Sequence, residues 1–324
     1  MLSRGQVAEL LTIDECTAAV EEAFRLYGRG KAQAPGVLGI HLENGGFHLK
    51  AGVLQLARNY FAAKVNANFP GNPAKWGLPT IQGVIVLCDA DDGRVLAVMD
   101  SMEITALRTA AATAVAAKYL ARPDSKRLTI CGCGAQGRFQ LRALAKLFDW
   151  QEVSAFDDDA EQAARFAQEL AAELSLPVTA AGNLTEAVRL SDVCATCTTS
   201  RKPLLSLADV RPGTFVAAVG ADNPEKQEIH PSLMAGSKVV VDLVEQCATI
   251  GDLHHAIAAG AMKKSDVHAE LGEIVAGKKP GRTSAEEIIV FDSTGMALQD
   301  VAAAAFAYEK AERQGSGVRF DFPA

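Results

Sequence analysis

The 324-residue chain is predicted to be an α/β protein with two domains. From Lys126 to about Val290, apolar β-type runs alternate with helical segments, a pattern typical of a doubly wound parallel sheet. From Pro35 to Asp100, short apolar runs are separated by Gly, Asn and Asp, which indicates an antiparallel sheet. The length also exceeds the roughly 250–300 residues at which single cores stop growing.

Composition narrows the class of protein. Hydrophobic residues make up 49% and charged residues 22%, as in ordinary globular proteins. The net charge of −7 comes without a basic block, so we expect neither a nucleic-acid partner nor an anionic membrane partner. No apolar run reaches about 20 residues and the start is charged and amphipathic, which predicts a cytoplasmic protein. The seven cysteines lie mostly in apolar segments, which predicts buried thiols rather than disulfides.

Helix signals bound the first domain. A Thr12 cap with Glu15 three residues later predicts a helix that Gly28 ends. Strands follow, with "DADDGR" as a hairpin turn, and then an alanine-rich helix, "SMEITALRTAAATAVAAKYLARPD", that ends at Pro123. A last apolar helix over 297–313 needs a covering partner and is expected to fold back on the first domain. The predicted domains are therefore 1–115 with 296–324, and 116–295.

A glycine pattern marks the second domain. Gly132, Gly134 and Gly137 form G-x-G-x-x-G directly after an apolar strand and before an amphipathic helix, the context of the dinucleotide fingerprint. The glycines allow the tight turn, the backbone approach to pyrophosphate and the helix–strand packing, respectively. Asp157 ends the next strand, 25 residues after Gly132, where a carboxylate meets the ribose hydroxyls. Because Asp157 and Asp158 would repel a 2′-phosphate, we expect a Rossmann-type domain that prefers NAD(H) to NADP(H).

Two cysteine pairs suggest a metal site as an alternative. Cys131 and Cys133 are matched by Cys194 and Cys197, and both pairs should lie at strand ends in one sheet. Structural zinc sites usually space their cysteines by two to four residues on tight turns, and Cys131-Gly-Cys133 is too close and too extended. The six histidines also follow no metal pattern. We expect no metal.

Charged residues in apolar segments are candidates for chemistry. Asp222 follows an apolar strand, so it should face the ligand crevice as a general acid or base, with a loop turn or a helix cap as its alternative role. Lys64 and Lys50 lie in apolar strands, and a buried lysine needs a partner such as the carboxylate of a small acid. Arg108 lies among alanines that should leave it exposed to an anion. Each cation could instead pair with Asp or Glu; together with Asp222 they favour a small anionic substrate.

Six motifs stand in order along the chain: "AKVNANFPGN", "ITALRTAAATAVAAKYLA", "CGCGAQGRFQL", "AVGADNPEKQEI", "ELGEIVAGKKPGR" and "FDSTGMALQD". In these motifs the chain resembles the ornithine cyclodeaminase and mu-crystallin family over nearly its whole length. The resemblance implies a homodimer in which both chain ends build an α+β dimerisation and substrate domain around a Rossmann domain. Members include cyclodeaminases, alanine dehydrogenase, ketimine and pyrroline-carboxylate reductases, and a hormone-binding lens protein.

The resemblance also implies residue roles. Lys64 and Arg108 would hold the substrate carboxylate, and Asp222, with Lys64 as its catalytic partner, would serve the amino or imino nitrogen. Besides the three glycines, the residues implied to line the NAD are Thr80, Arg108, Thr109, Ala135, Gln136, Asp157, Thr198, Val219, Lys226 and Ser293. Two departures stand out: Gly36 or Val37 replaces an arginine found in many members, and Lys50 replaces the methionine of the usual Met-Pro-Ala stretch. Lys50 is therefore a candidate to restore the lost charge on the carboxylate.

The leading functional hypothesis is an NAD-dependent oxidoreductase. It would interconvert a small L-amino acid and its cyclic or acyclic 2-imino acid, as a pyrroline-2-carboxylate reductase or an amino-acid dehydrogenase does. One alternative is an ornithine cyclodeaminase, a lyase that forms L-proline and ammonia with recycled NAD. Another is a non-enzymatic binder of a small ligand, of the mu-crystallin type.

Overall fold

Two units make up the chain in the computed structural model, which describes residues 1–33 and 37–320. Unit 1 comprises Met1–Arg108 and Met296–Ala324, and unit 2 is Thr109–Gly295. The chain passes from one to the other within a continuous helix, α4 (Ser101–Leu120). The predicted boundary after residue 115 falls seven residues further along the same helix, because a change of partner along a helix leaves no break in its sequence pattern.

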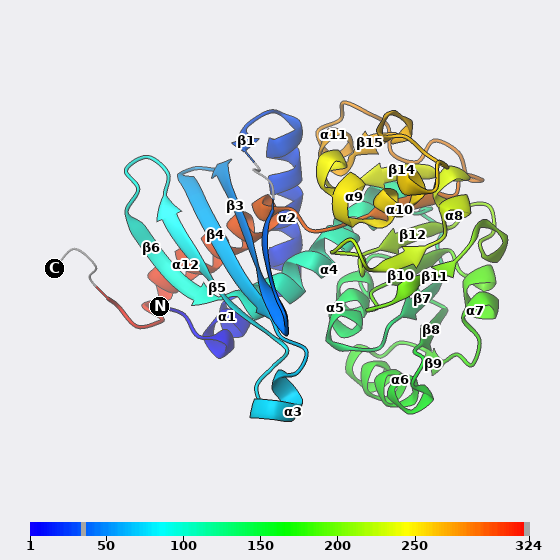
Figure 1. The fold of residues 1–324 in the computed structure, drawn as a ribbon, viewed down its shortest axis with the longest axis horizontal. Coiled ribbons are helices and arrows are strands. Elements are labelled where there is room, and N and C mark those ends of the chain that lie inside the picture. Colours follow the sequence, from blue (N-terminus) through cyan, green and yellow to red (C-terminus); the bar gives the residue numbers. More distant parts are fainter. Residues whose placement is uncertain (34–36, 321–324) are drawn as a thin grey trace. The chain divides into compact units, whose positions relative to one another are not determined.

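Unit 1 is an antiparallel sheet with helices (Figure 1). Its sheet has the order β1-β3-β4-β5-β6, with β2 paired to β3, and the antiparallel arrangement confirms the prediction. The "DADDGR" hairpin is also confirmed: the Asp89 N–H donates to the Arg94 carbonyl at 3.0 Å. The elements are α1 (Arg4–Leu10), α2 (Ile13–Gly28), β1 (Ala32–Gln33), β2 (Leu38–Leu42), β3 (Gly45–Gln55), β4 (Asn59–Asn68), α3 (Asn72–Trp76), β5 (Ile81–Asp89), β6 (Val95–Asp100) and α12 (Ala297–Gln314).

The last helix covers the sheet of unit 1. α12 packs against α2, β3 and β4, as predicted for a helix too apolar to remain uncovered. Gly52 of β3 permits this close approach, since a Cβ there would lie 3.0 Å from Leu298 Cδ2. The reciprocal capping box of Thr12 and Glu15 begins α2, also as predicted. α1 was not predicted, although Ser3 and Gln6 form the same kind of box.

Unit 2 is built on an eight-stranded parallel sheet in the order β15-β14-β16-β12-β10-β7-β8-β9 (Figure 1). The chain builds outward from β7 through β8 to β9 and then returns to add β10 on the other side of β7. The neighbours β7 and β10 are therefore the topological switch point of a doubly wound sheet, which confirms the Rossmann-type prediction.

The strands of unit 2 are short and mostly buried. β16 lies between β12 and β14 and was not predicted as a strand. The elements are β7 (Arg127–Cys131), α5 (Ala135–Leu144), β8 (Glu152–Phe156), α6 (Ala160–Leu174), β9 (Val178–Ala180), α7 (Leu184–Leu190), β10 (Val193–Thr196), β11 (Arg201–Leu205), η1 (Leu207–Asp209), β12 (Phe215–Ala218), β13 (Gln227–Ile229), α8 (Pro231–Ala235), β14 (Lys238–Val241), α9 (Val244–Ile250), α10 (Asp252–Ala258), η2 (Lys264–Asp266), β15 (Ala269–Glu270), α11 (Leu271–Val275) and β16 (Ile289–Asp292).

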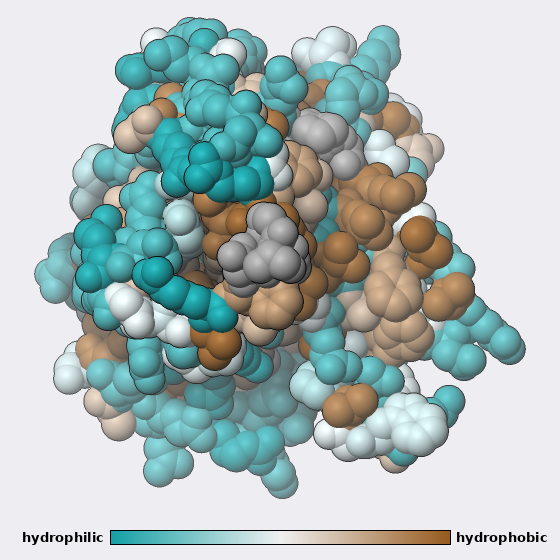
Figure 2. All heavy atoms as spheres, turned by 90° about the vertical axis from the view of Figure 1, so that its left-hand side faces the viewer, coloured by the Kyte–Doolittle hydropathy of each residue, from teal (hydrophilic) through white to brown (hydrophobic). Residues whose placement is uncertain are grey.

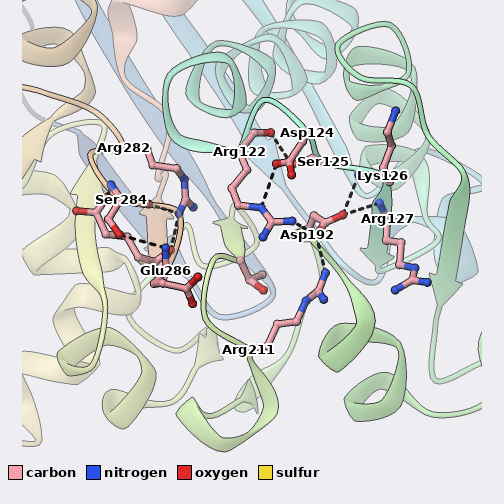
Figure 3. A network of polar contacts seen from close by, with 12 residues as sticks. Arg122, Asp124, Ser125, Lys126, Arg127, Asp192, Arg211, Arg282, Ser284 and Glu286 are labelled. Carbon is pink, nitrogen blue, oxygen red and sulfur yellow. Dashed lines mark hydrogen bonds and ion pairs between the residues drawn. The ribbon is translucent and has the colours of Figure 1, made fainter.

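A polar network ties the amino ends of the central strands together (Figure 3). Asp192, directly before β10, accepts hydrogen bonds from the Arg122 and Arg211 guanidinium groups. The same carboxylate accepts the backbone N–H groups of Lys126 and Arg127 at 2.8 and 3.0 Å. One buried carboxylate thus joins the end of α4 to β7 and β10. This network lies at the amino ends of the strands, away from their carboxyl ends, where ligands of such sheets bind.

All seven cysteines are free thiols and five of them are buried. Burial raises the pKa of the Cys133 thiol to about 12, which makes it a poor nucleophile or metal ligand. In the part of the chain that the structure describes, no helix is both long and apolar enough to cross a lipid bilayer.

Candidate functional site

A cleft lies at the switch point of unit 2. It has a volume of about 300 Å³ and is lined by the loop after β7, the end of β8 and the loop after β10. The predicted residues Gly132, Gly134, Asp157 and Thr198 are part of its wall, and Asp158 lies beside them. The prediction of a ligand crevice at the carboxyl ends of these strands agrees with this geometry.

The three glycines have the structural features that a pyrophosphate cradle needs. Gly132 has φ +101°, which favours glycine, and a Cβ on Gly137 would lie 2.1 Å from the Gly132 carbonyl oxygen. A Cβ on Gly134 would meet no protein atom within 4 Å, so a ligand can approach the backbone at this residue. Gly134 is the N-cap of α5, and its predicted companions Ala135, Gln136 and Gly137 form the first turn. The loop therefore fits a dinucleotide, whose pyrophosphate would rest on the helix amino terminus.

Asp157 is held in place from two sides. Its Oδ2 accepts the Cys133 backbone N–H at 2.8 Å and the Gln162 side-chain amide at 3.0 Å. Asp158 is exposed next to it. The carboxylate is thus fixed at the end of β8, where the ribose of a bound dinucleotide would lie.

The loop after β12 carries Asp222. This residue is exposed and its Oδ1 lies 2.8 Å from Lys226 Nζ. An exposed ion pair thus stands where apolar walls were expected around Asp222. Below the loop, buried Glu228 accepts the backbone N–H groups of Gly220 (2.8 Å) and Thr198 (2.6 Å), so it joins this loop to the one after β10.

Val219 and Ser293, the other predicted cofactor residues of unit 2, also follow central strands. The Val219 N–H donates to the Thr196 carbonyl and the Ser293 N–H to the Ala218 carbonyl, both at 2.9 Å. Thr109 is half-buried in α4. The first two therefore lie at the same sheet edge as the cleft, although none of these three lines it.

A cluster of three cations and one acid lies in unit 1. Lys64 of β4 is buried and its Nζ lies 2.8 Å from Asp300 of α12. Arg108 Nε lies 3.1 Å from the same carboxylate, and Arg108 Nη1 lies 3.0 Å from Gln299 Oε1. Lys50 of β3 is the direct cross-strand partner of Lys64. We call Lys50, Lys64, Arg108 and Asp300 the cation cluster, because it joins three basic side chains and one acid.

Burial sets the protonation of the cluster. It lowers the pKa of Lys64 to about 7, with further lowering by Arg108 and Lys50, while Asp300 opposes the shift. The two cations Lys64 and Arg108 hold the pKa of Asp300 below its usual range despite its burial. An added carboxylate would favour the charged form of Lys64, so binding of an anion and protonation of Lys64 would support each other.

The structure corrects the prediction for Arg108. Its side chain is 7% exposed, not open to solvent, because α12 covers it and supplies both of its hydrogen-bond acceptors. Thr80, one residue before β5, accepts the Phe69 N–H through its carbonyl, and no bond joins it to the cluster among the described residues. Of the positions expected to carry the family's arginine, Gly36 lies outside the described residues and Val37 is half-buried.

Two residues of the candidate site, Asp300 and Glu228, were not identified from the sequence. Asp300 is the only charged residue over 297–308, a signal of the same kind that drew attention to Arg108. Glu228 was missed because acids at loop ends are usually exposed, and the fold buries this one completely.

The family model described as the ornithine cyclodeaminase/mu-crystallin family matches residues 1–315. The chain belongs to this family. Among its curated relatives is the alanine dehydrogenase of Archaeoglobus fulgidus, 41% identical over 322 residues, which are 99% of this chain and 98% of the relative.

Solved structures of family members agree closely with this chain. An archaeal alanine dehydrogenase dimer with bound NAD has a TM-score of 0.95 and 41% identity, covering 99% of this chain and 98% of the other. The Thermococcus litoralis Δ1-pyrroline-2-carboxylate reductase in complex with NADH and L-proline has a TM-score of 0.94 and 35% identity, covering 98% and 99%. The iminosuccinate reductase of Paracoccus denitrificans in complex with NAD⁺ has a TM-score of 0.91 and 36% identity, covering 97% and 96%.

Proposed function

We propose that this protein is an NAD-dependent oxidoreductase that interconverts a small L-amino acid and its 2-imino acid. The observation that carries the proposal is the cation cluster, a buried carboxylate-binding group on the same chain as a dinucleotide cleft. The relatives named for alanine, pyrroline-2-carboxylate and iminosuccinate act on substrates that share a carboxylate next to a C–N bond.

The side chains of this protein have different roles in the proposed reaction. Lys64 and Arg108 hold the substrate carboxylate, and Lys50 adds charge where the family's arginine is missing. Asp222 passes a proton to or from the substrate nitrogen, with Lys226 as its ion-pair partner. When bound, NADH supplies the hydride for the C=N carbon, and the protein contributes orientation and charge.

The acids at the end of β8 favour NAD(H) over NADP(H). Asp157 is fixed in the cleft wall and Asp158 lies beside it, so a 2′-phosphate would face two carboxylates. No arginine lines this cleft among the described residues. Repulsion therefore supports the preference for a free ribose hydroxyl.

A homodimer is the assembly that the surface of unit 1 supports. Strand β5 alternates: Ile85 and Leu87 are buried on the face that α12 covers, whereas Val84 on the opposite face is 43% exposed. Figure 2 views the molecule from the side of β6 and shows hydrophobic residues gathered in several areas. Large apolar residues exposed on the Val84 face of this sheet are Leu38, Ile40, Leu42 and Val95. An exposed apolar sheet face of this kind calls for a partner.

Replacement of the proposed acid–base group tests the reaction. Asp222→Asn should lower kcat by at least about 100-fold, because the amide cannot exchange the proton, while the dissociation constant for NADH stays nearly unchanged. Glu225→Gln is the matched control, because Glu225 is an exposed acid of the same loop that pairs with Arg201. Activity of Asp222→Asn within tenfold of the unmodified enzyme would remove Asp222 from this role.

A further inference from the structure

Four buried carboxyl groups lie at one edge of the sheet in unit 2. Glu228, Asp242, Asp252 and Asp292 each have 0% exposure. Their hydrogen bonds come from backbone N–H groups, hydroxyls and one thiol rather than from a lysine or arginine. Four negative charges without a cation would be costly in a dry interior, so some of these groups must hold protons.

In Asp252 and Asp292, one oxygen of each carboxyl group has no hydrogen-bond donor. Asp252 Oδ1 accepts the N–H groups of Glu228 (2.9 Å) and Ile229 (2.8 Å), and Asp292 Oδ2 accepts the Leu253 N–H (2.9 Å). The Asp292 carboxylate also lies against Gly251, the residue before Asp252, because a Cβ there would be 2.6 Å from Oδ2 and 2.8 Å from Oδ1. The remaining oxygens, Asp252 Oδ2 and Asp292 Oδ1, are buried without a hydrogen-bond partner among the described residues.

One proton bound to this pair would remove the repulsion between the two carboxylates and supply the missing hydrogen bond. Two ionised carboxylates side by side repel each other, whereas a carboxyl O–H on one can donate to the unpaired oxygen of the other. Burial raises the pKa of Asp252 to about 7, with Glu228 adding to the shift. Burial also raises the pKa of Asp292 well above its ordinary value, with Asp252 and Asp242 contributing in turn.

We propose that Asp252 and Asp292 share one proton in the folded protein and that this pair positions the loop that carries Asp222. Asp252 fixes the backbone of β13 at Glu228, and the Glu228 carboxylate in turn holds Gly220, two residues before Asp222. The same carboxylate holds Thr198 in the cleft wall. The positioning role rests on the proposed function; the shared proton does not.

Other titratable groups on the surrounding elements define the electrostatic setting. Glu228 faces Asp252, and Asp242 and the Cys247 thiol lie on the Asp292 side. The imidazole of His255, on the same helix as Asp252, is bonded to the Lys226 carbonyl instead. The remaining charged or titratable groups of these elements are Lys226, His230, Lys238, Glu245, His254 and Glu270.

Infrared spectroscopy tests the shared proton directly. Unmodified protein at neutral pH should show the carbonyl stretch of a protonated carboxylic acid. Asp252→Asn and Asp292→Asn should each lose that band, because the new amide donates the hydrogen bond and the remaining carboxylate stays ionised. Glu228→Gln and the surface control Asp149→Asn should retain it. Absence of the band from unmodified protein, or its loss only in Glu228→Gln, would overturn the assignment.

The pH dependence of the free energy of unfolding is a second test of the shared proton. The folded pKa of the pair lies above the unfolded value of about 4, so the folded state binds more protons and loses stability as pH rises from about 4 to 7. The unfolding equilibrium constant of unmodified protein, relative to Asp252→Asn, should therefore rise by up to about tenfold per pH unit across this window. A pH-independent ratio would contradict the shared proton even if no enzymatic activity were found.

Turnover tests the positioning role. With saturating NADH and substrate, kcat of the unmodified enzyme should fall above about pH 7, because loss of the shared proton leaves two like charges whose repulsion displaces Asp252 and the β13 backbone bonded to it. Asp252→Asn should keep a flat kcat over the same range, an effect that a merely structural contact would not produce. Identical kcat profiles for the two proteins would limit the pair to a stability role and contradict its link to Asp222.

Discussion

At the scale of single residues, burial changes the pKa of Lys64. Its side chain is 4% exposed, and the resulting desolvation lowers its pKa to about 7 although Asp300 lies 2.8 Å away. A charged Lys64 binds a carboxylate, and a neutral Lys64 does not. If the cluster binds the substrate carboxylate as proposed, its affinity should depend on pH near neutrality.

The pH profile of kcat/KM reports this titration. Because the charged form predominates below the pKa, kcat/KM should fall by about tenfold per pH unit above pH 7. Lys64→Arg keeps its charge, so its profile should lack this alkaline limb whatever its absolute rate. The measurement is kcat/KM from pH 6 to 9 at saturating NADH. An unchanged limb in Lys64→Arg would mean that another group titrates.

Asp300 is the counter-charge on which the cluster depends. Asp300→Asn would leave Lys64 and Arg108 buried without an anion, so the free energy of unfolding should fall by about 3–5 kcal/mol. Urea denaturation measures the change. Glu312→Gln, an exposed acid on the same helix, should stay within about 0.5 kcal/mol of the unmodified protein. Equal stability of the two variants would show that the ion pairs contribute nothing.

At the scale of elements, two glycines of the β7–α5 region are predicted to have different roles, one in NADH binding and one in stability. A Cβ at Gly134 would meet no protein atom within 4 Å, whereas at Gly137 it would collide with the Gly132 carbonyl. Gly134→Ala should therefore leave stability within about 1 kcal/mol but weaken NADH binding by about tenfold or more, because the methyl group covers the bare backbone. Gly137→Ala should destabilise the protein by about 1–3 kcal/mol.

Fluorescence titration with NADH and thermal unfolding distinguish the two glycines. Loss of affinity in Gly137→Ala alone, with normal binding by Gly134→Ala, would be inconsistent with a pyrophosphate approaching the backbone at Gly134.

Elements with a strong local signal were predictable. Capping residues and apolar spacing defined α2, and the glycine pattern after an apolar strand defined the β7–α5 loop. The strand β16 was missed, although it is as long as the predicted β12 and β14 between which it lies: its apolar run follows Glu286 and Glu287, whereas a glycine precedes each of the other two within two residues. Likewise, the sequence placed Arg108 and Asp300 on two helices but not in contact, since 192 residues separate them.

At the scale of the whole molecule, the exposed apolar face of the unit 1 sheet predicts self-association. Val84→Glu places a charge on that face and should convert a dimer into a monomer in sedimentation or light-scattering measurements. Leu190→Glu is the matched control: Leu190 is an equally exposed apolar residue, but it belongs to α7 of unit 2. A Val84→Glu protein that stays dimeric would place the interface elsewhere.

Which amino acid the enzyme accepts is beyond what sequence patterns alone could predict. Lys64 and Arg108 are proposed to bind the carboxylate that all candidate substrates share, whereas the side chain would be selected by loops whose shape depends on tertiary packing. The absence of an arginine at Gly36 or Val37 and the presence of Lys50 remain our prediction of where this pocket differs from those of other members.

The most direct test follows NADH absorbance with purified protein and a panel of cyclic and acyclic 2-imino acids. An ammonia assay with ornithine and NAD⁺ runs beside it. The account predicts that NADH is oxidised in step with the loss of an imine. Formation of ammonia and proline from ornithine with no net change in NADH would contradict it and establish a cyclodeaminase. Tight NADH binding without turnover of any substrate would also contradict it, in favour of a ligand-binding protein.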